Sequence, residues 1–165
     1  MQRLTRLAAE CDGTLFMALL AGFQVLLGRY TGQTDVAVGV PIANRTQVAT
    51  EGIVGTFVNT LVMRNNLLQG LTFRELLANV RRTAVDAYEH QDMPFERLVE
   101  ELSVKRDLSH SPLVQVLFNV ANAPIGPVEF AGLSWAPFEY DAGAAQFALT
   151  LTVDTELTRL ATLSY

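Results

Sequence analysis

The chain has 165 residues, half of them apolar, which is enough to bury the core of a single domain. Its net charge is −5 and no stretch concentrates Lys or Arg, so we expect no nucleic-acid partner. The single cysteine, Cys11, excludes an internal disulfide and a cysteine-based metal site, and it favours a reducing, cytoplasmic setting.

The first predicted elements are two helices. Apolar residues recur at helical spacing before Asp12-Gly13, where glycine's tolerance of left-handed backbone predicts the end of a short helix. Thr14 predicts the cap of a second helix that reaches about Tyr30 and is apolar on nearly every side. Its most apolar run, Leu15–Leu27, is shorter than the ~20 residues needed to cross a bilayer. We therefore predict a buried helix and no membrane partner.

Two strands are predicted next. Asp35–Pro41 is a β-branched run typical of a strand covered on both faces, and its Gly39 would let another backbone come close. A polar loop separates it from a second strand at Phe57–Arg64.

Helices and then strands follow. Thr72-Phe73-Arg74-Glu75 is a capping box that predicts a helix to about Tyr88, and Pro94 suits the first turn of a short helix at Phe95–Leu102. Further strands are expected at Leu113–Val120, Phe147–Val153 and Leu157–Tyr165, with a crossing segment at Ala123–Pro127. The predicted fold class is α/β, with a mixed α+β sheet flanked by helices.

The residues alone offer few groups for chemistry. His90-Gln91-Asp92 places a carboxylate two residues from an imidazole and could orient a general base. The favoured alternative is that Asp92 caps the helix begun by Pro94 while His90 bonds to nearby backbone. His110 is expected in an exposed loop, and Cys11 to be structural. Without a phosphate loop, nucleophile motif or metal-ligand cluster, we assign no catalytic residue and no metal.

Three blocks, in this order, resemble the late motifs of condensation domains of nonribosomal peptide synthetases. Val54–Arg64 is VGTFVNTLVMR, similar to the family's Gly-x-Phe-Val-Asn-Thr motif. His90–Val99 is HQDMPFERLV, similar to His-Gln-Asp-x-Pro-Phe-Glu, and Arg106–Phe118 resembles the family's Pro-Leu-Phe-Gln-Val segment, with Val114 in place of Phe. The family's His-His-x-x-x-Asp-Gly motif is absent, and Ala148 stands where relatives often have Asp.

The resemblance implies one lobe of a two-lobed fold like chloramphenicol acetyltransferase, with the reaction in a tunnel between the lobes. Residues 1–165 are then expected to be a C-terminal subdomain, cut at both ends and lacking the N-terminal lobe. The family joins a donor acyl or peptidyl thioester to an acceptor aminoacyl thioester, both borne on phosphopantetheine arms. We expect no cofactor bound directly. The implied partners are the N-terminal lobe, the upstream and downstream peptidyl carrier proteins, and an adenylation domain of the same synthetase.

The resemblance also implies roles for individual residues. Asn59 is expected nearest the reaction centre, donating to a thioester oxygen or orienting the acceptor amine; the equal alternative is that it only bonds neighbouring backbone. The expected tunnel wall is Gly55, Phe57, Val58, Asn59 and Thr60. Structural roles are expected for His90, Gln91, Asp92, Pro94, Phe95, Arg106, Ser111, Pro112 and Gln115. Ala123–Gly132 is expected to cross to the missing lobe.

Two alternatives to a peptide-forming domain remain open. Epimerisation and heterocyclisation domains share the architecture, although the Phe-Val-Asn-Thr sequence resembles peptide-forming members more closely. The isolated chain could instead bind carrier proteins without turnover, and without the histidine motif we expect it to be inactive alone.

Overall fold

The computed structural model describes residues 1–103, 111–121, 145–155 and 161–165, and shows a five-stranded mixed sheet flanked by helices. The strand order is β2-β1-β3-β4-β5. The strands are β1 (Asp35–Ile42), β2 (Asn59–Asn66), β3 (Val116–Ala121), β4 (Leu149–Asp154) and β5 (Ala161–Ser164). The helices are α1 (Gln2–Ala9), α2 (Leu15–Thr31), α3 (Val48–Glu51), α4 (Phe73–Glu89) and α5 (Phe95–Glu101). The predicted fold class is confirmed.

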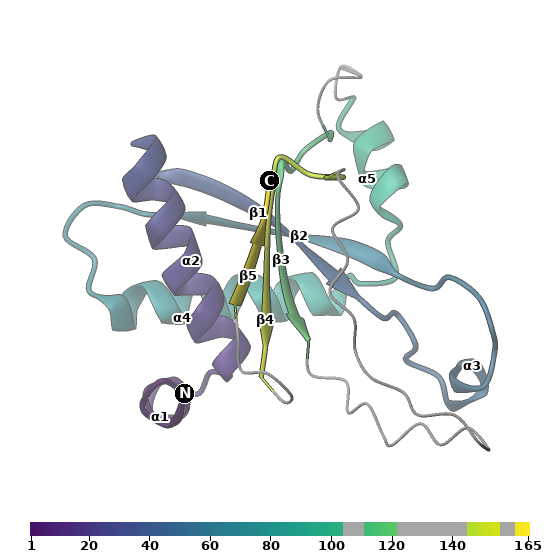
Figure 1. Cartoon of the computed structure of the whole chain (residues 1–165), viewed down its shortest axis with the longest axis horizontal. Coiled ribbons are helices and arrows are strands. Elements are labelled where there is room, and N and C mark those ends of the chain that lie inside the picture. The colour runs from purple at the N-terminus through teal and green to yellow at the C-terminus, as the bar shows by residue number, and fades with distance from the viewer. Residues whose placement is uncertain (104–110, 122–144, 156–160) are drawn as a thin grey trace, which may run out of the picture.

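The sheet has two parts that meet at one narrow junction. β1 and β2 form an antiparallel pair along their full length, and β3 pairs in parallel with β4, which pairs antiparallel with β5. Between β1 and β3 the register contains a single pair, Gly39 with Leu117. Figure 1 shows β1 and β2 running from side to side, while β3, β4 and β5 stand upright in the view. Side-chain packing therefore has to hold the two parts together.

Phe118 is the largest buried side chain of β3 in that packing. Its side chain is fully buried in β3, and its ring lies 5.8 Å from the ring of Phe16 and 5.6 Å from that of Phe23, both on α2. These centroid distances are typical of favourable aromatic pairs. Gly39 lies at the same junction, where a Cβ would be 3.0 Å from the Val114 side chain, so that side chain would have to shift by a few tenths of an ångström. The backbone that comes close to Gly39 from β3 is that of Leu117.

Helices α2 and α4 are joined to the hairpin by a buried polar network. Gln24 of α2 is completely buried, and its Nε2 donates to the carbonyl oxygen of Met63 at 2.9 Å and to that of Val36 at 3.4 Å. Asn65 Nδ2 donates to Gln24 Oε1 at 3.1 Å, and Thr83 Oγ1 of α4 donates to Asn65 Oδ1 at 2.9 Å. The network fixes how both helices sit on β1 and β2, since each polar group would be costly to bury alone.

Replacing Gln24 by leucine is expected to lower the free energy of unfolding by about 1–3 kcal/mol, because it leaves the Asn65 amide and the Met63 carbonyl without their partner in the core. Urea unfolding monitored by circular dichroism measures the change. Gln33→Leu, at an exposed position after α2, is the matched control and should leave the midpoint unchanged. Equal midpoints for Gln24→Leu and the unmodified chain would contradict the role of the network.

Several element ends were predicted correctly. Thr14 caps α2 by accepting from the Met17 N–H at 3.3 Å, and the capping box at Thr72 and Glu75 is complete. After α1 the left-handed residue was expected to be Gly13. In the structure it is Asp12, with φ of 52°.

Three strands begin later along the chain than the sequence predicted. Phe57 and Val58 precede β2, because the last hairpin pair joins Ile42 to Asn59. Leu113, with φ of 62°, lies before β3 in a conformation that no strand contains, and Phe147 lies before β4. Residues 157–160 of the last expected strand lie outside the described ranges, as does the expected crossing segment Ala123–Gly132. The short helix α3 was not predicted.

The capping box should make part of the stability depend on pH. Hydrogen bonds from the Thr72 backbone and then from its hydroxyl hold the pKa of the exposed Glu75 carboxyl below its usual value. A lowered folded-state pKa means that the stabilisation is present above the unfolded pKa of about 4.3 and is lost as pH falls through the folded value. Thermal unfolding of Glu75→Gln, which keeps the cap but cannot ionise, should therefore depend less on pH in this range. Identical slopes would show that the ionised form adds nothing.

Candidate functional site

The first two motif blocks meet at Asn59, the first residue of β2. Its side-chain Nδ2 donates to the carbonyl oxygen of Gln91 at 2.9 Å and to that of Met93 at 2.8 Å. Its Oδ1 accepts from the N–H of Phe95 at 3.0 Å and from that of Thr60 at 2.9 Å. An amide has two N–H donors and two acceptor lone pairs, so all four are in use. The Asn59 junction, made of this side chain and its four backbone partners, ties β2 to the loop before α5.

This geometry bears on the two roles open to Asn59. A thioester oxygen could receive an Asn59 N–H only if the bond to Gln91 or to Met93 were broken first. The side chain is 9% exposed, and burial makes an orphaned carbonyl costly. The hydrogen bonds match the second of the two roles, bonding to backbone, although the backbone comes from a segment more than 30 residues away.

Asn59 also accepts the hydrogen bond from the first N–H of α5. The N-cap residue of α5 is Pro94, which makes no side-chain cap, and the N–H of Phe95 is instead satisfied by Asn59 Oδ1. The expectation that Asp92 caps this helix is therefore wrong. Local spacing suggested Asp92, whereas a side chain from a distant strand does the capping. Asp92 itself is exposed.

His90 is held by the end of its own helix. Its Nδ1 lies 2.8 Å from the carbonyl oxygen of Asp86, and since a carbonyl only accepts, Nδ1 carries the proton. The backbone of His90 is also bonded to nearby backbone. Its N–H donates to the Ala87 carbonyl oxygen, and its carbonyl oxygen accepts from the N–H of Met93. Burial raises the pKa of nearby Tyr88, so that side chain stays neutral at physiological pH. His90 thus bonds nearby backbone.

The start of the first motif block is held by Arg45, which sequence reasoning did not single out. Its Nη1 donates to the carbonyl oxygens of Thr50 and, at 2.9 Å, Ile53, and its Nη2 donates to that of Gly55 at 3.0 Å. The guanidinium also lies 4.2 Å from the centroid of the Phe57 ring. Planar, forked donors of this kind suit several carbonyls at once. The sequence carried one signal, since Arg45 is the one cation between the two strands.

Four of the five expected tunnel residues are exposed or half-buried, and Asn59 is buried. Val58 is 62% exposed, Thr60 is half-buried, and Phe57 is half-buried under Arg45. A Cβ at Gly55 would make one ordinary contact, 3.7 Å from the Phe57 ring, so nothing within the described chain crowds it. Whether these side chains form a tunnel wall stays a prediction.

The third motif block is described only from Ser111. Arg106 and His110 lie outside the described residues. Ser111 and Pro112 are half-buried, Val114 is fully buried against Gly39, and the Gln115 carbonyl accepts from the Leu149 N–H at 3.3 Å. The block therefore starts β3 and positions β4 beside it. Ala148 is exposed just before β4.

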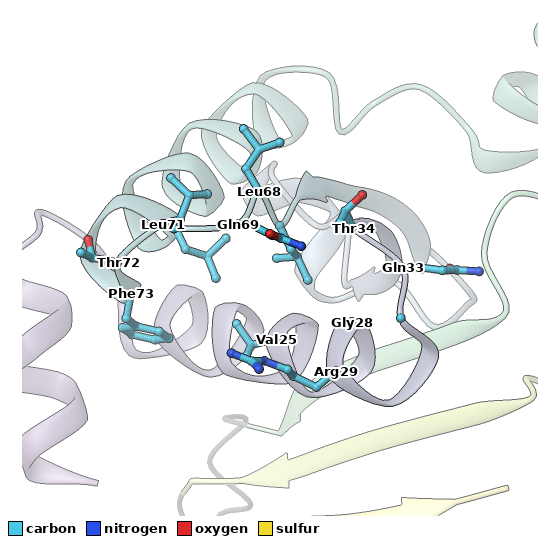
Figure 2. Close-up of a pocket in the computed structure, with 14 residues that line it drawn as sticks. Val25, Gly28, Arg29, Gln33, Thr34, Leu68, Gln69, Leu71, Thr72 and Phe73 are labelled. Carbon is cyan, nitrogen blue, oxygen red and sulfur yellow. The ribbon is translucent and has the colours of Figure 1, made fainter.

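A separate cavity of about 530 Å³ lies at the opposite ends of β1 and β2 (Figure 2). It is open on one side and is lined by the C-terminal half of α2, residues 32–34, the segment 67–72 and the first turn of α4. Figure 2 shows Arg29 lying along α2 beside Val25, below Leu71. The Asn59 junction is at the Ile42 end of β1, so this cavity is not part of it.

Neither a membrane span nor a metal site occurs in the part of the chain that the structure describes. Within those ranges no helix combines the length and apolar character that a membrane crossing requires. Over the same residues, no three His, Cys, Asp or Glu side chains gather closely enough to hold a metal ion.

Arg45→Lys is expected to lower the free energy of unfolding by about 1–2 kcal/mol, because an ammonium cannot serve three carbonyls and stack on Phe57 together. The amides of residues 50–58 should also exchange with solvent faster. Hydrogen exchange read by mass spectrometry measures this, with Arg29→Lys, at an exposed position, as the matched control. Unchanged exchange at 50–58 would show that Arg45 does not hold the loop.

Comparison with known proteins gives one consistent result. A family model described as "Condensation domain" matches residues 1–162. A linear gramicidin synthase from Brevibacillus parabrevis is 52% identical over 153 residues, which are 92% of this chain and 3% of that protein. Tyrocidine synthase 3 from the same organism is 46% identical over 92% of this chain and 2% of its own length. The chain thus spans only a few per cent of the length of the curated relatives it matches.

Solved structures agree on the fold. A four-domain nonribosomal peptide synthetase, holo-AB3403, has a TM-score of 0.84 at 25% identity, over 97% of this chain and 13% of that one. The condensation domain from the Monacolin K polyketide synthase MokA has a TM-score of 0.77 at 24% identity, over 98% of this chain and 37% of that one.

Proposed function

The chain belongs to the condensation domain family of nonribosomal peptide synthetases, and from that membership we propose that it forms one lobe of a domain that makes peptide bonds. In this role it would help to join a donor acyl or peptidyl thioester to an acceptor aminoacyl thioester. The observation that carries the proposal is the family match over residues 1–162, which contains all three motif blocks. The fold is that of the chloramphenicol acetyltransferase-like proteins.

We infer that the chain positions substrates and does not itself move protons. Two motif groups that could donate to a substrate are already engaged: both Asn59 N–H groups bond backbone, and His90 Nδ1 bonds the Asp86 carbonyl. Amide formation needs a base for the attacking amine, and efficient proton transfer needs that base within hydrogen-bond reach. The other lobe of the domain would supply it, and the isolated chain would be inactive.

The partners follow from the same proposal. The N-terminal lobe would complete the tunnel, and upstream and downstream carrier proteins would present the two thioesters on phosphopantetheine arms. An adenylation domain of the same synthetase would load the acceptor carrier. Support comes from the relatives, which are peptide synthetases many times longer than this chain.

A hybrid condensation domain tests the proposal. Residues 1–162 would replace the matching segment of a condensation domain from the linear gramicidin synthase, and loaded donor and acceptor carriers would be added. We expect a peptide product, detected by mass spectrometry, from the hybrid and none from the 165-residue chain alone. A folded hybrid that epimerises or cyclises the substrate would favour those related domains.

Carrier binding without turnover is the second candidate function for the isolated chain. It is favoured by the Asn59 junction, in which both N–H groups of the Asn59 side chain already bond backbone carbonyls. Titration of the 165-residue chain with a loaded carrier protein, followed by NMR, would detect binding. Product formed by the chain alone would exclude a purely binding role.

A further inference from the structure

The cavity between α2 and the segment 67–72, which we name the 67–72 pocket, is separate from the three motif blocks. Its volume of about 530 Å³ is in the range of pockets that hold small organic molecules. None of the described residues that line it belongs to Val54–Arg64, His90–Val99 or Arg106–Phe118. The proposed function therefore gives this pocket no role.

Most of the side chains that line the pocket are aliphatic. Leu76 is 4% exposed, and Val25, Leu67 and Leu71 are half-buried, so the lining leaves part of its apolar surface in water. Figure 2 shows Val25 on α2 and Leu71 on the opposite wall. A hydrocarbon chain lying between these walls would bury apolar surface on both sides, which is favourable.

The walls of the pocket are held in place by the fold. The N–H of Leu67 donates to the carbonyl oxygen of Thr34 at 2.6 Å, which joins the two loops that line the pocket. A Cβ at Gly28 would meet the Leu67 side chain, so the missing side chain lets this segment lie close to α2. The capping box at Thr72 fixes the start of α4. A pocket that is formed before binding costs little conformational entropy when a ligand enters.

Arg29 is the only charged residue among the described residues that line the pocket. Neither an ion pair nor a side-chain hydrogen bond joins it to another described residue. Figure 2 shows its side chain lying along α2 beside Val25 and below Leu71, so the guanidinium lies next to the apolar lining. A guanidinium matches the two oxygens of a carboxylate with two parallel hydrogen bonds.

The acidic side chains nearest to the lining in the sequence are already bonded elsewhere. Asp35, which follows Thr34, accepts from Arg64 at 2.9 and 2.6 Å, and Glu75 accepts from the Thr72 backbone and hydroxyl, both at 2.8 Å. Neither carboxylate is bonded to Arg29. The pocket thus combines apolar walls with one cation, which complements a ligand that has an apolar chain and one negative charge.

We propose that the 67–72 pocket binds an aliphatic carboxylate, with the carboxylate on Arg29 and the hydrocarbon chain between Val25, Leu71 and Leu76. A cationic ligand has no acidic partner among the described lining residues, and a small inorganic anion gains nothing from the aliphatic walls. The site lies at the ends of β1 and β2 opposite the Asn59 junction, and the inference does not depend on the proposed function. A segment from another part of the domain is the competing occupant.

Titration of the 165-residue chain with decanoate, below the concentration at which it forms micelles, tests the proposal. Methyl NMR should show saturable shifts at Val25, Leu71 and Leu76, whereas the exposed side chains of Val48 and Leu102 should not shift. Butyrate, which has the charge but only a short chain, should bind at least about tenfold more weakly. Decanol, which has the chain without the charge, should bind at least about threefold more weakly.

Replacing Arg29 separates the charge from the apolar contact. Arg29→Gln should weaken decanoate binding at least about threefold and leave decanol binding unchanged. Arg82→Gln, at an exposed position on α4, is the matched control and should change neither. Urea midpoints confirm that both variants are folded. Equal affinity of Arg29→Gln and the unmodified chain for decanoate, or equal binding of decanol and decanoate to the unmodified chain, would overturn the proposal.

Two further outcomes would also overturn it. Decanoate shifts that include Val48 and Leu102 would show detergent-like binding to exposed apolar residues. The same titration of the hybrid domain with the linear gramicidin synthase should give an unchanged affinity, and lost binding there would assign the pocket to a segment of the domain itself. Peptide formation by the hybrid is measured separately, so a hybrid that binds decanoate without making product would retain the pocket and reject the proposed function.

Discussion

Asn59→Asp is expected to lower the free energy of unfolding by about 3 kcal/mol or more, because two backbone carbonyls lose their donors and face a carboxylate instead. Each orphaned buried acceptor costs on the order of 1–3 kcal/mol, and repulsion between the carboxylate and the carbonyls of Gln91 and Met93 adds to it. The two bonds that Oδ1 accepts could survive the change, so the loss isolates the donor half of the amide.

Urea unfolding gives the size of this effect, and hydrogen exchange gives its location. The amides of residues 91–97 should exchange faster in Asn59→Asp, because the variant detaches the loop before α5 from β2. Asn79→Asp is the matched control, since that side chain is on α4 and already accepts from Arg82. Unchanged stability together with lost peptide formation in the hybrid domain would contradict the positioning role and would return Asn59 to direct contact with substrate.

Phe118→Ala is expected to lower the free energy of unfolding by about 3–5 kcal/mol, the usual cost of truncating a fully buried phenylalanine. Its ring packs on Phe16 and Phe23 of α2 at the place where β1 and β3 share a single register pair. Without that ring, the contact of β3 with α2 would be weaker, and the remaining apolar residues of β3 and β4 would have to hold this part of the sheet on the core.

The sharper test of this prediction is which strands of Phe118→Ala lose protection against hydrogen exchange. Amides of β4 should lose more protection than amides of β2, since β4 depends on β3 for its place in the sheet. Phe147→Ala, at a partly exposed position before β4, serves as the control and should cost much less. A uniform loss of protection over β2 and β4 would show that the two parts of the sheet unfold together.

Much of the local structure could be predicted because its causes lie within a few residues. The cap at Thr14, the capping box at Thr72 and Glu75, and the strand at Asp35–Ile42 each depend on neighbouring residues or on a continuous apolar run. The family could be predicted for a similar reason, since the three motif blocks are contiguous and specific.

Prediction from the sequence failed where a residue far away along the chain makes a hydrogen bond that a nearby residue was expected to make. Asp92 was the natural cap for α5 by spacing, yet Asn59 supplies that bond from β2. Arg45 went unnoticed because its partners are backbone carbonyls, and backbone carbonyls leave no mark in an amino-acid sequence.

The family, the fold class and most of the elements can be predicted from the amino-acid sequence, because motifs, caps and apolar periodicity act over short separations along the chain. The partners of the Asn59 amide, the carbonyls that Arg45 binds and the apolar side chains left exposed between β1 and β2 become visible only in the folded chain. These properties depend on which backbone groups come within hydrogen-bond distance after folding, and residues more than 30 positions apart, such as Asn59 and Gln91, meet only when the whole core has formed.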